Sequence, residues 1–275
     1  MHTKLALIGT LGLGIAIGSA LPQTSENPQT PLLYANHYMQ NSAEYRAICL
    51  QTYNWAESIL RVRARAHQTL QERTPGTKPP CVILDLDETV IDNSPFQTAL
   101  DQASVIYTPA AWAKWETASG VLELIPGAMR FLEEAKKMGV AIVFISNRNE
   151  RSREAMITQL TELGIKDYEL LLMTNTSDKT ARRNQIAQKY EILMLVGDNL
   201  RDFSEEFKAP KISSNSDYEG IAEAVRKRKE VVDKNANKFG ADYIVLPNPV
   251  YGEWEMLKGD NPHKSLRPTK FTLLK

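Results

Sequence analysis

Short apolar runs alternate with amphipathic segments along most of this chain, and this alternation restricts its fold more than any other feature. Apolar residues every three or four positions predict helices over 127–137, 150–163 and 179–189. Continuous apolar runs between such helices are typical of strands buried on both faces. The sequence therefore predicts an α/β fold, a doubly wound parallel sheet. We expect its strands at 81–84, 140–145, 169–173, 192–196 and 243–246.

Two further helical regions accompany this pattern. Apolar positions recur at helical spacing from 41 to 71, which predicts an amphipathic N-terminal helix. The stretch 93–125, between the first strand and its helix, is too long for an ordinary loop and contains Trp112 and Trp115 at helical spacing. We therefore expect a small helical insertion, or cap, at about 93–125.

The first forty residues differ in composition from the rest. Lys4 precedes an uncharged apolar run, and Gly18-Ser19-Ala20 are small residues suited to a signal peptidase. We therefore expect a signal peptide at 1–20, a polar linker at 21–40 and one domain at 41–275. Export to the periplasm, the cell envelope or the medium follows, with no membrane anchor after cleavage. An uncleaved anchor is the alternative, but the run is shorter than the ~20 apolar residues of a spanning helix.

The charge balance limits the partners. Lys+Arg and Asp+Glu both number 33, so the net charge is zero. No overall field then attracts a nucleic-acid polymer or an anionic membrane. An anionic ligand must be bound by a local arrangement of side chains.

Such arrangements follow four of the expected strands. Ligands of open α/β sheets bind outside the carboxyl ends of the strands, and each of these ends carries polar residues. The clusters are Asp-Leu-Asp-Glu-Thr at 85–89, Ser-Asn-Arg at 146–148, Ser-Asp-Lys at 177–179 and Gly-Asp-Asn-Leu-Arg-Asp at 197–202.

The residue types fit the transfer of a phosphoryl group. Asp85 and Asp87 lie two apart on an extended chain and so face the same side. Asp85 can attack phosphorus, and Asp87 can protonate the leaving oxygen. The candidate donors to the phosphate oxygens are Thr89, Ser146, Asn147 and Lys179.

A cation is needed because two carboxylates would otherwise repel the phosphate. Asp198 and Asp202, four residues apart at another strand end, suit an oxygen-ligand site for Mg²⁺ shared with Asp85. Asp and Asn are also common in turns and helix caps after strands, and Lys179 could face solvent in a first helical turn. All the clusters in this order are harder to explain as caps alone.

Other phosphatase chemistries lack their residues. Neither Cys49 nor Cys81 is followed six residues later by Arg, and the four histidines form no cluster with metal-ligand spacing. The two cysteines could pair in an oxidising compartment. They could equally remain as two buried free thiols, and the sequence leaves both alternatives open.

The ordered motifs resemble those of the haloacid dehalogenase superfamily. Within it, 85–94 (DLDETVIDNS), 146–148 (SNR), 197–203 (GDNLRDF) and 246–254 (LPNPVYGEW) are similar to the class C acid phosphatases. The resemblance implies Asp85 as nucleophile, Asp87 as acid and base, and Mg²⁺ held by Asp85, the Asp87 carbonyl and Asp198. It also implies phosphate monoester substrates, 5′-nucleotides or nicotinamide mononucleotide. The lipid-attachment cysteine of that family is missing, which puts membrane anchoring in doubt but not the chemistry.

The same resemblance suggests where the organic part of the substrate binds. Trp112, Trp115 and Tyr251 could stack on a nucleobase or nicotinamide ring, at ~1–3 kcal/mol per base. The alternative is that both tryptophans pack the insertion against the core.

Two rival functions remain. A phosphoprotein phosphatase of the same superfamily also carries the sequence Asp-Leu-Asp-Glu-Thr, although the export signal and the aromatic insertion argue against it. A non-catalytic binding or storage protein on this fold would be expected to lose its nucleophile, whereas Asp85 is present. An oligomer is left open.

Overall fold

The structure is a computed structural model, described here over residues 32–266. The predicted signal peptide at 1–20 and the first part of the predicted linker lie outside these residues. Helix α1 occupies Leu32–Asn41, so the expectation of a linker as far as residue 40 is wrong from residue 32 onwards. This helix has only a weak apolar stripe and buries Asn36 and Met39. It packs against α3 of the insertion, and the sequence of α1 alone does not predict this contact.

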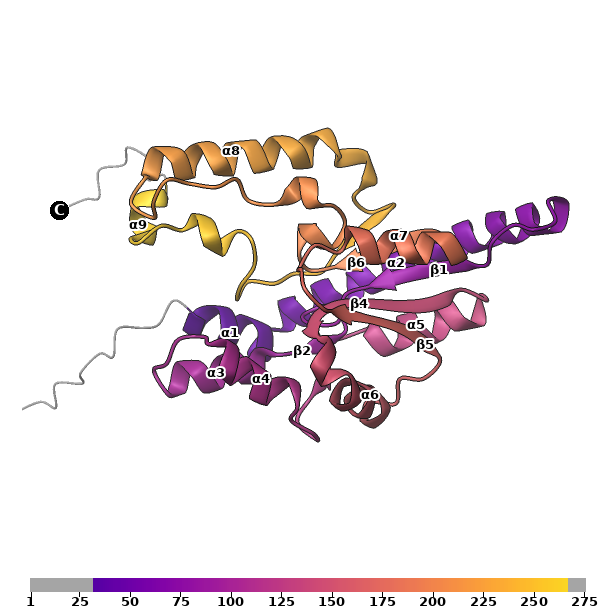
Figure 1. Cartoon of the computed structure of the whole chain (residues 1–275), viewed down its shortest axis with the longest axis horizontal. Coiled ribbons are helices and arrows are strands. Elements are labelled where there is room, and N and C mark those ends of the chain that lie inside the picture. The colour runs from indigo at the N-terminus through magenta and orange to yellow at the C-terminus, as the bar shows by residue number, and fades with distance from the viewer. Residues whose placement is uncertain (1–31, 267–275) are drawn as a thin grey trace, which may run out of the picture. The chain divides into compact units, whose positions relative to one another are not determined.

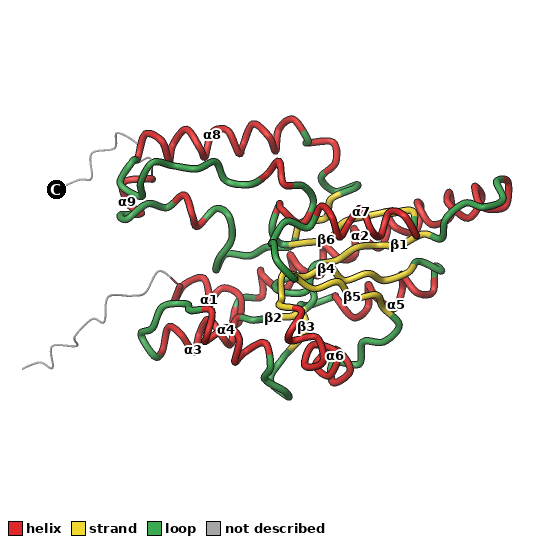
Figure 2. Tube along the Cα trace, in the orientation of Figure 1, coloured by secondary structure: helices red, strands yellow, loops and turns green. Residues whose placement is uncertain are grey.

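A five-stranded parallel sheet forms the centre of the described part, with the strand order β5-β4-β1-β6-β7. Figure 2 shows the strands side by side. The predicted doubly wound α/β fold is therefore confirmed. The strands are β1 (Pro80–Leu84), β4 (Ala141–Asn149), β5 (Tyr168–Met173), β6 (Glu191–Gly197) and β7 (Tyr243–Val245).

Helices connect these strands as the sequence predicts, and the insertion carries two more. The long helix α2 (Ala43–Arg73) precedes the sheet. The insertion contains β2 (Ile91–Asp92), α3 (Ser94–Gln102), α4 (Pro109–Glu116) and β3 (Glu123–Leu124). The remaining helices are α5 (Ala128–Lys137), η1 (Glu150–Ser152), α6 (Arg153–Glu162), α7 (Thr180–Lys189), η2 (Leu200–Asp202), η3 (Glu205–Phe207), α8 (Tyr218–Lys234), η4 (Ala236–Lys238), η5 (Glu255–Leu257) and α9 (Pro262–Ser265).

The two faces of the sheet bury different sets of side chains. Along β1, Val82 and Leu84 face the main core, to which α2, α5 and α6 contribute. Cys81 and Ile83 face the opposite side, where Ile186 of α7 covers them. This alternation is the expected period of two for a strand. Figure 1 shows α2 and α5 running along the sheet.

Helix α2 packs in the main core and also contacts the polar segment that follows β1. Ser42 caps the helix, since its side chain accepts a hydrogen bond from the Tyr45 amide at 2.9 Å. One turn-spaced row of its side chains is buried, including Tyr53, whose hydroxyl donates to the Thr89 carbonyl at 2.5 Å. Gly127 begins α5 with φ of 96°, and a Cβ there would lie 3.1 Å from Tyr53. A side chain at residue 127 would therefore be strained.

The two cysteines are free and fully buried. Cys49 belongs to the main core and Cys81 to the core on the other face of the sheet, so they cannot pair. Burial raises the pKa of Cys49 to about 11 and that of Cys81 to about 12. The structure thus supports the alternative of two unreactive thiols.

None of the helices in residues 32–266 has the length and apolar character needed to span a membrane.

We expect both thiols to stay unreactive in the native protein. Because the reactive species is an exposed thiolate, Ellman's reagent should label neither cysteine in native protein. It should label both after denaturation without a reductant. Absorbance of the released thionitrobenzoate measures this, and finding no thiol in the denatured, unreduced protein would instead indicate a disulfide.

Candidate active site

Lys179 joins three segments at the carboxyl edge of the sheet. Its Nζ lies 2.6 Å from Oδ1 of Asp85, which follows β1, and 2.7 Å from Oδ1 of Asp202 in η2. Lys179 is only 3% exposed, so it does not face solvent. Burial opposes its charge, but Asp202 and Asp85 outweigh this and raise its pKa. The ammonium group is therefore charged and fixed by two carboxylates.

Asp85, Asp198 and Asp202 could together hold a metal ion. One carboxylate oxygen of each lies within 4.8 Å of the others. Burial raises the pKa of Asp85 to about 7, opposed by Lys179 and reinforced by Asp202 and Asp87. Burial and the neighbouring carboxylates of Asp202 and Asp85 raise the pKa of Asp198 well above its usual value. Three carboxylates facing one ammonium leave an excess negative charge that a divalent cation would balance, and carboxylate oxygens are its preferred ligands.

Neighbouring donors already orient two of these carboxylates. Asp198 accepts hydrogen bonds from Thr89 Oγ1 at 3.2 Å and from Asn248 Nδ2 at 2.8 Å. Asp202 has both oxygens engaged, Oδ1 by Lys179 and Oδ2 by the Asn199 amide at 3.0 Å. Asp85 has the fewest hydrogen bonds of the three, because Lys179 contacts only its Oδ1.

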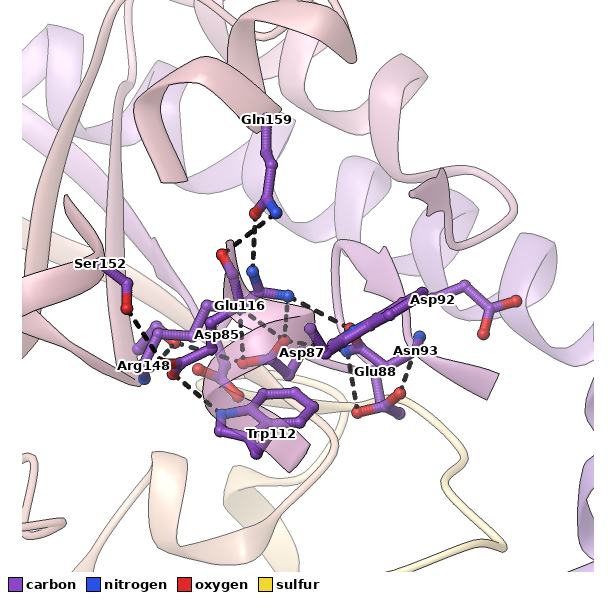
Figure 3. Close-up of polar contacts among 12 residues, drawn as sticks. Asp85, Asp87, Glu88, Asp92, Asn93, Trp112, Glu116, Arg148, Ser152 and Gln159 are labelled. Atoms are coloured by element: carbon purple, nitrogen blue, oxygen red, sulfur yellow. Dashed lines mark hydrogen bonds and ion pairs between the residues drawn. The ribbon is translucent and has the colours of Figure 1, made fainter. Parts of the chain in front are cut away.

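Asp87 is held from several sides (Figure 3). Arg148 donates from Nη2 and Nε to Oδ1, at 2.8 and 2.9 Å. Asn93 Nδ2 donates to the same oxygen at 2.9 Å, and Ser146 Oγ lies 3.5 Å from Oδ2. Charge-assisted hydrogen bonds of this kind are strong, so they hold the Asp87 carboxylate in position.

Strand alternation separates the residues of the 146–148 cluster. The strand β4 runs on to Asn149, beyond the predicted end at 145. Ser146 and Arg148 are therefore buried on the side of Asp87, whereas Asn147 points the other way and is exposed. The Asn147 side chain accepts a hydrogen bond from Arg182 Nη2 at 2.7 Å, and the same guanidinium donates to the Ser146 carbonyl.

The three predicted stacking residues lie in two regions. Trp112 and Trp115 are half-buried on α4 and both contact Phe96, with ring centroids 5.3 and 5.7 Å apart. The guanidinium of Arg148 lies over the Trp112 ring, 5.6 Å from its centroid. Tyr251 is half-buried in the segment after β7 and packs against the main core.

The chain matches a known protein family over most of its length. Residues 19–254 match the family described as HAD superfamily, subfamily IIIB (Acid phosphatase), where HAD denotes haloacid dehalogenase. The chain belongs to this family. Its members are acid phosphatases, which are phosphoric monoester hydrolases.

Solved structures agree with this assignment. The subfamily IIIB chain is similar to two structures of the class C acid phosphatase from Bacillus anthracis, with TM-scores of 0.68 and 0.66 at 30% and 28% identity. The second of these has tungstate bound. In both, the similarity covers 88% of this chain and 91% of the other. The predicted resemblance to class C acid phosphatases is confirmed.

Two curated plant proteins match a smaller region. Acid phosphatase 1 from Solanum lycopersicum is 23% identical over 129 residues, which are 44% of this chain and 50% of that protein. Vegetative storage protein 1 from Arabidopsis thaliana is 23% identical over 141 residues, 46% of this chain and 52% of that one. The chain thus matches about half the length of these curated relatives.

Several residues of this subfamily IIIB site were not singled out by the sequence. Arg148 and Asn93 hold Asp87, and Asn248 holds Asp198, although all three stood within the motifs quoted. For Arg148 a signal existed, since it lies two residues from Ser146 just as Asp87 does from Asp85. Glu116 and Gln159 carried little local signal, because the contacts that join Glu116 to Asn149 and Ser152, and Gln159 to the Glu116 carbonyl, each span more than 30 residues.

Replacing Lys179 by Met should destabilise the fold strongly. The change leaves Asp85 and Asp202 buried beside each other without a cation, and breaking such a buried pair costs about 3 kcal/mol or more. Urea unfolding in the presence of a chelator measures this. Lys189→Met is the matched control, because its ion pair with Glu169 is exposed and should cost less than about 1 kcal/mol. Equal, small effects of the two changes would contradict this account of Lys179.

Proposed function

We propose that the protein is a Mg²⁺-dependent acid phosphatase that hydrolyses phosphate monoesters through an aspartyl-phosphate intermediate. One observation carries the proposal. Asp85, which is ion-paired with Lys179 through Oδ1, lies at the same edge of the sheet as Asp198 and Asp202. Membership of subfamily IIIB supports the same reaction class. The nucleophile, a fixed ammonium and a candidate cation site are then within reach of one phosphoryl group.

In the first step a carboxylate oxygen of Asp85 attacks phosphorus. A bond forms between that oxygen and phosphorus, and the bond to the leaving oxygen breaks. Asp87 gives its proton to the leaving oxygen, which departs as an alcohol. Lys179 stabilises the charge that develops on the phosphoryl oxygens.

In the second step water hydrolyses the aspartyl phosphate. The oxygen of the water bonds to phosphorus, and Asp87, now ionised, takes a proton from that water. The bond from phosphorus to Asp85 breaks, and both carboxyl groups return to their starting states. Arg148 and Asn93 keep Asp87 in one place through both proton transfers.

We assign the phosphate oxygens to donors around Asp85. These are Ser146 Oγ, Lys179 Nζ, the Thr89 hydroxyl and the Asn147 amide. Arg182 engages Oδ1 of Asn147, which leaves its Nδ2 free to donate. The strand alternation described above places Asn147 least favourably of the four.

We assign Mg²⁺ to Asp85, Asp198 and the Asp87 carbonyl. Asp202 remains a candidate ligand, but both its oxygens already have donors, so we give it the role of holding Lys179. When bound, the cation would neutralise charge on the phosphoryl group and the nucleophile.

For the substrate we propose 5′-nucleotides or nicotinamide mononucleotide. Trp112, Trp115 and Tyr251 supply planar aromatic surfaces for a base, as the resemblance suggests. One of these rings, that of Trp112, lies against Arg148, the residue that donates hydrogen bonds to Asp87. We also propose export, with removal of residues 1–20, since the apolar run there ends in small residues.

Asp85→Asn should abolish turnover while leaving the fold intact. The amide cannot act as the nucleophile, so we expect kcat to fall by at least about 1,000-fold, within the range that loss of a nucleophile costs. Phosphate release from a mononucleotide with Mg²⁺ measures activity, and circular dichroism checks the fold. Substantial activity in the folded variant would contradict the covalent mechanism.

The same assay separates the rival functions. Preference for a phosphoserine peptide over mononucleotides would favour a phosphoprotein phosphatase. No release from any monoester, including an aryl phosphate, would favour a storage protein like the Arabidopsis relative.

Asp198→Asn should weaken Mg²⁺ binding by at least about ten-fold, because it removes a charged ligand from a site that depends on charge. Isothermal titration calorimetry measures the affinity without turnover. Asp217→Asn is the control, since Asp217 is a half-buried cap of α8 and does not belong to the carboxylate cluster. Unchanged Mg²⁺ affinity in Asp198→Asn would show that the cation binds elsewhere.

A further inference from the structure

We propose that Trp115 of the insertion is a positioning residue for Asp87 and acts through Asn93. This inference rests on the proposed function, in which Asp87 is the general acid. It assigns to the indole N–H of Trp115 a role in positioning the general acid, in addition to the surface that the ring would offer the substrate. Figure 3 shows the surrounding network of polar contacts.

Asn93 connects the insertion to Asp87. Its Oδ1 accepts hydrogen bonds from Trp115 Nε1 at 2.7 Å and from Arg148 Nη2 at 3.2 Å. Its Nδ2 donates to Asp87 Oδ1 at 2.9 Å and to Glu88 Oε2 at 3.3 Å. Asn93 is completely buried, so no water competes for these positions.

These partners fix which way the Asn93 amide points. Indole and guanidinium nitrogens can only donate, so the Asn93 atom that faces Trp115 and Arg148 must be the acceptor Oδ1. With the amide reversed, Nδ2 would face the two donors and Oδ1 would face the two carboxylates. The Trp115 N–H is therefore one of two groups that make Asn93 present a donor to Asp87.

The position of Asn93 in the chain supports a dedicated role for its side chain. Asn93 is the N-cap residue of α3, where Asn usually accepts a hydrogen bond from the first turn, worth about 1 kcal/mol. Here its side chain makes no capping hydrogen bond. Instead it points to Asp87 and Trp115, and the first amide of α3, that of Ser94, donates to Asp92 Oδ1 at 2.8 Å.

The rest of the insertion holds Trp115 firmly in place. Its ring stacks on Phe96 of α3 at an interplanar angle of 29°. The next residue, Glu116, is buried and accepts hydrogen bonds from Trp112 Nε1, the Asn149 amide and Ser152 Oγ, at 2.8 to 3.1 Å. Helix α4 is thereby held to the end of β4 and to η1, one residue along the chain from Trp115.

The chemistry of the leaving group gives this role a specific signature. A general acid matters most when the leaving oxygen is strongly basic, as in an alkyl phosphate, and little for p-nitrophenyl phosphate. A stacking surface would show the opposite preference, because only the aryl substrate has a ring. A purely structural residue would affect both substrates equally.

The test is kcat/KM of Trp115→Phe for glycerol 2-phosphate and for p-nitrophenyl phosphate, measured as released phosphate. Phe keeps an aromatic ring beside Phe96 and removes the N–H together with the five-membered part of the indole, as the control below also does. We expect about a ten-fold loss for the glycerol ester, part of the ~10²–10⁴-fold that a general acid supplies. For the aryl ester we expect a loss below about two-fold.

Trp55→Phe is the matched control. It also removes an indole N–H that donates a hydrogen bond, at 2.7 Å to the Gly240 carbonyl, at the amino-terminal end of β7 and away from the site. Both esters should be turned over normally by this variant. Thermal unfolding followed by circular dichroism confirms that each variant is folded.

A double variant tests the route through Asn93. In an Asn93→Ala background, Trp115→Phe should cause less than about a two-fold further loss for the glycerol ester, because the two residues act in one chain of contacts. Full additivity overturns the proposal. So do equal losses for both esters, a larger loss for the aryl ester, or no loss. If the wild-type protein hydrolyses neither ester, the proposed function fails instead.

Discussion

The buried ammonium of Lys179 is the interaction on which the site depends. It lies between carboxylates that follow two different strands, and it comes itself from the start of α7. Removing a charge from water is costly unless partners surround it closely. Three segments that are distant in sequence must therefore meet within hydrogen-bonding distance, and the parallel sheet brings them there because its strand ends share one edge.

A second set of contacts joins the insertion to this edge. Asp87 receives Arg148 from β4 and Asn93 from the start of α3, while α4 contributes Trp115 and Glu116 to the same network. The insertion thus belongs to the hydrogen-bond network around Asp87, the proposed general acid. The structure around Asp87 resembles the shell that orients metal ligands, in which each polar atom limits the freedom of the next.

Sequence patterns predicted the sheet, its flanking helices and the clusters at the strand ends. A strand buried on both faces needs a continuous apolar run, and such runs are easily recognised in a sequence. They failed where a partner is distant. The polar continuation of β4 and the packing of α1 depend on contacts with other elements. The sequence predicts a phosphate donor at Asn147 and not at Arg148, because a strand that ends at residue 145 does not reveal the alternation that buries Arg148. Roles for Asn93 and Glu116 required the insertion to be placed against the core.

The shared indole and amide contacts have a consequence for how such a protein can diversify. The surface of an insertion is normally the part free to vary, since changes there alter recognition without touching reactivity. In this chain Asn93 accepts a hydrogen bond from the insertion and donates one to Asp87, the proposed general acid, so a change in α4 would also reach Asp87. A change of ligand preference would then be easier through the segment that carries Tyr251 than through α4. That segment follows β7, which lies at one edge of the sheet.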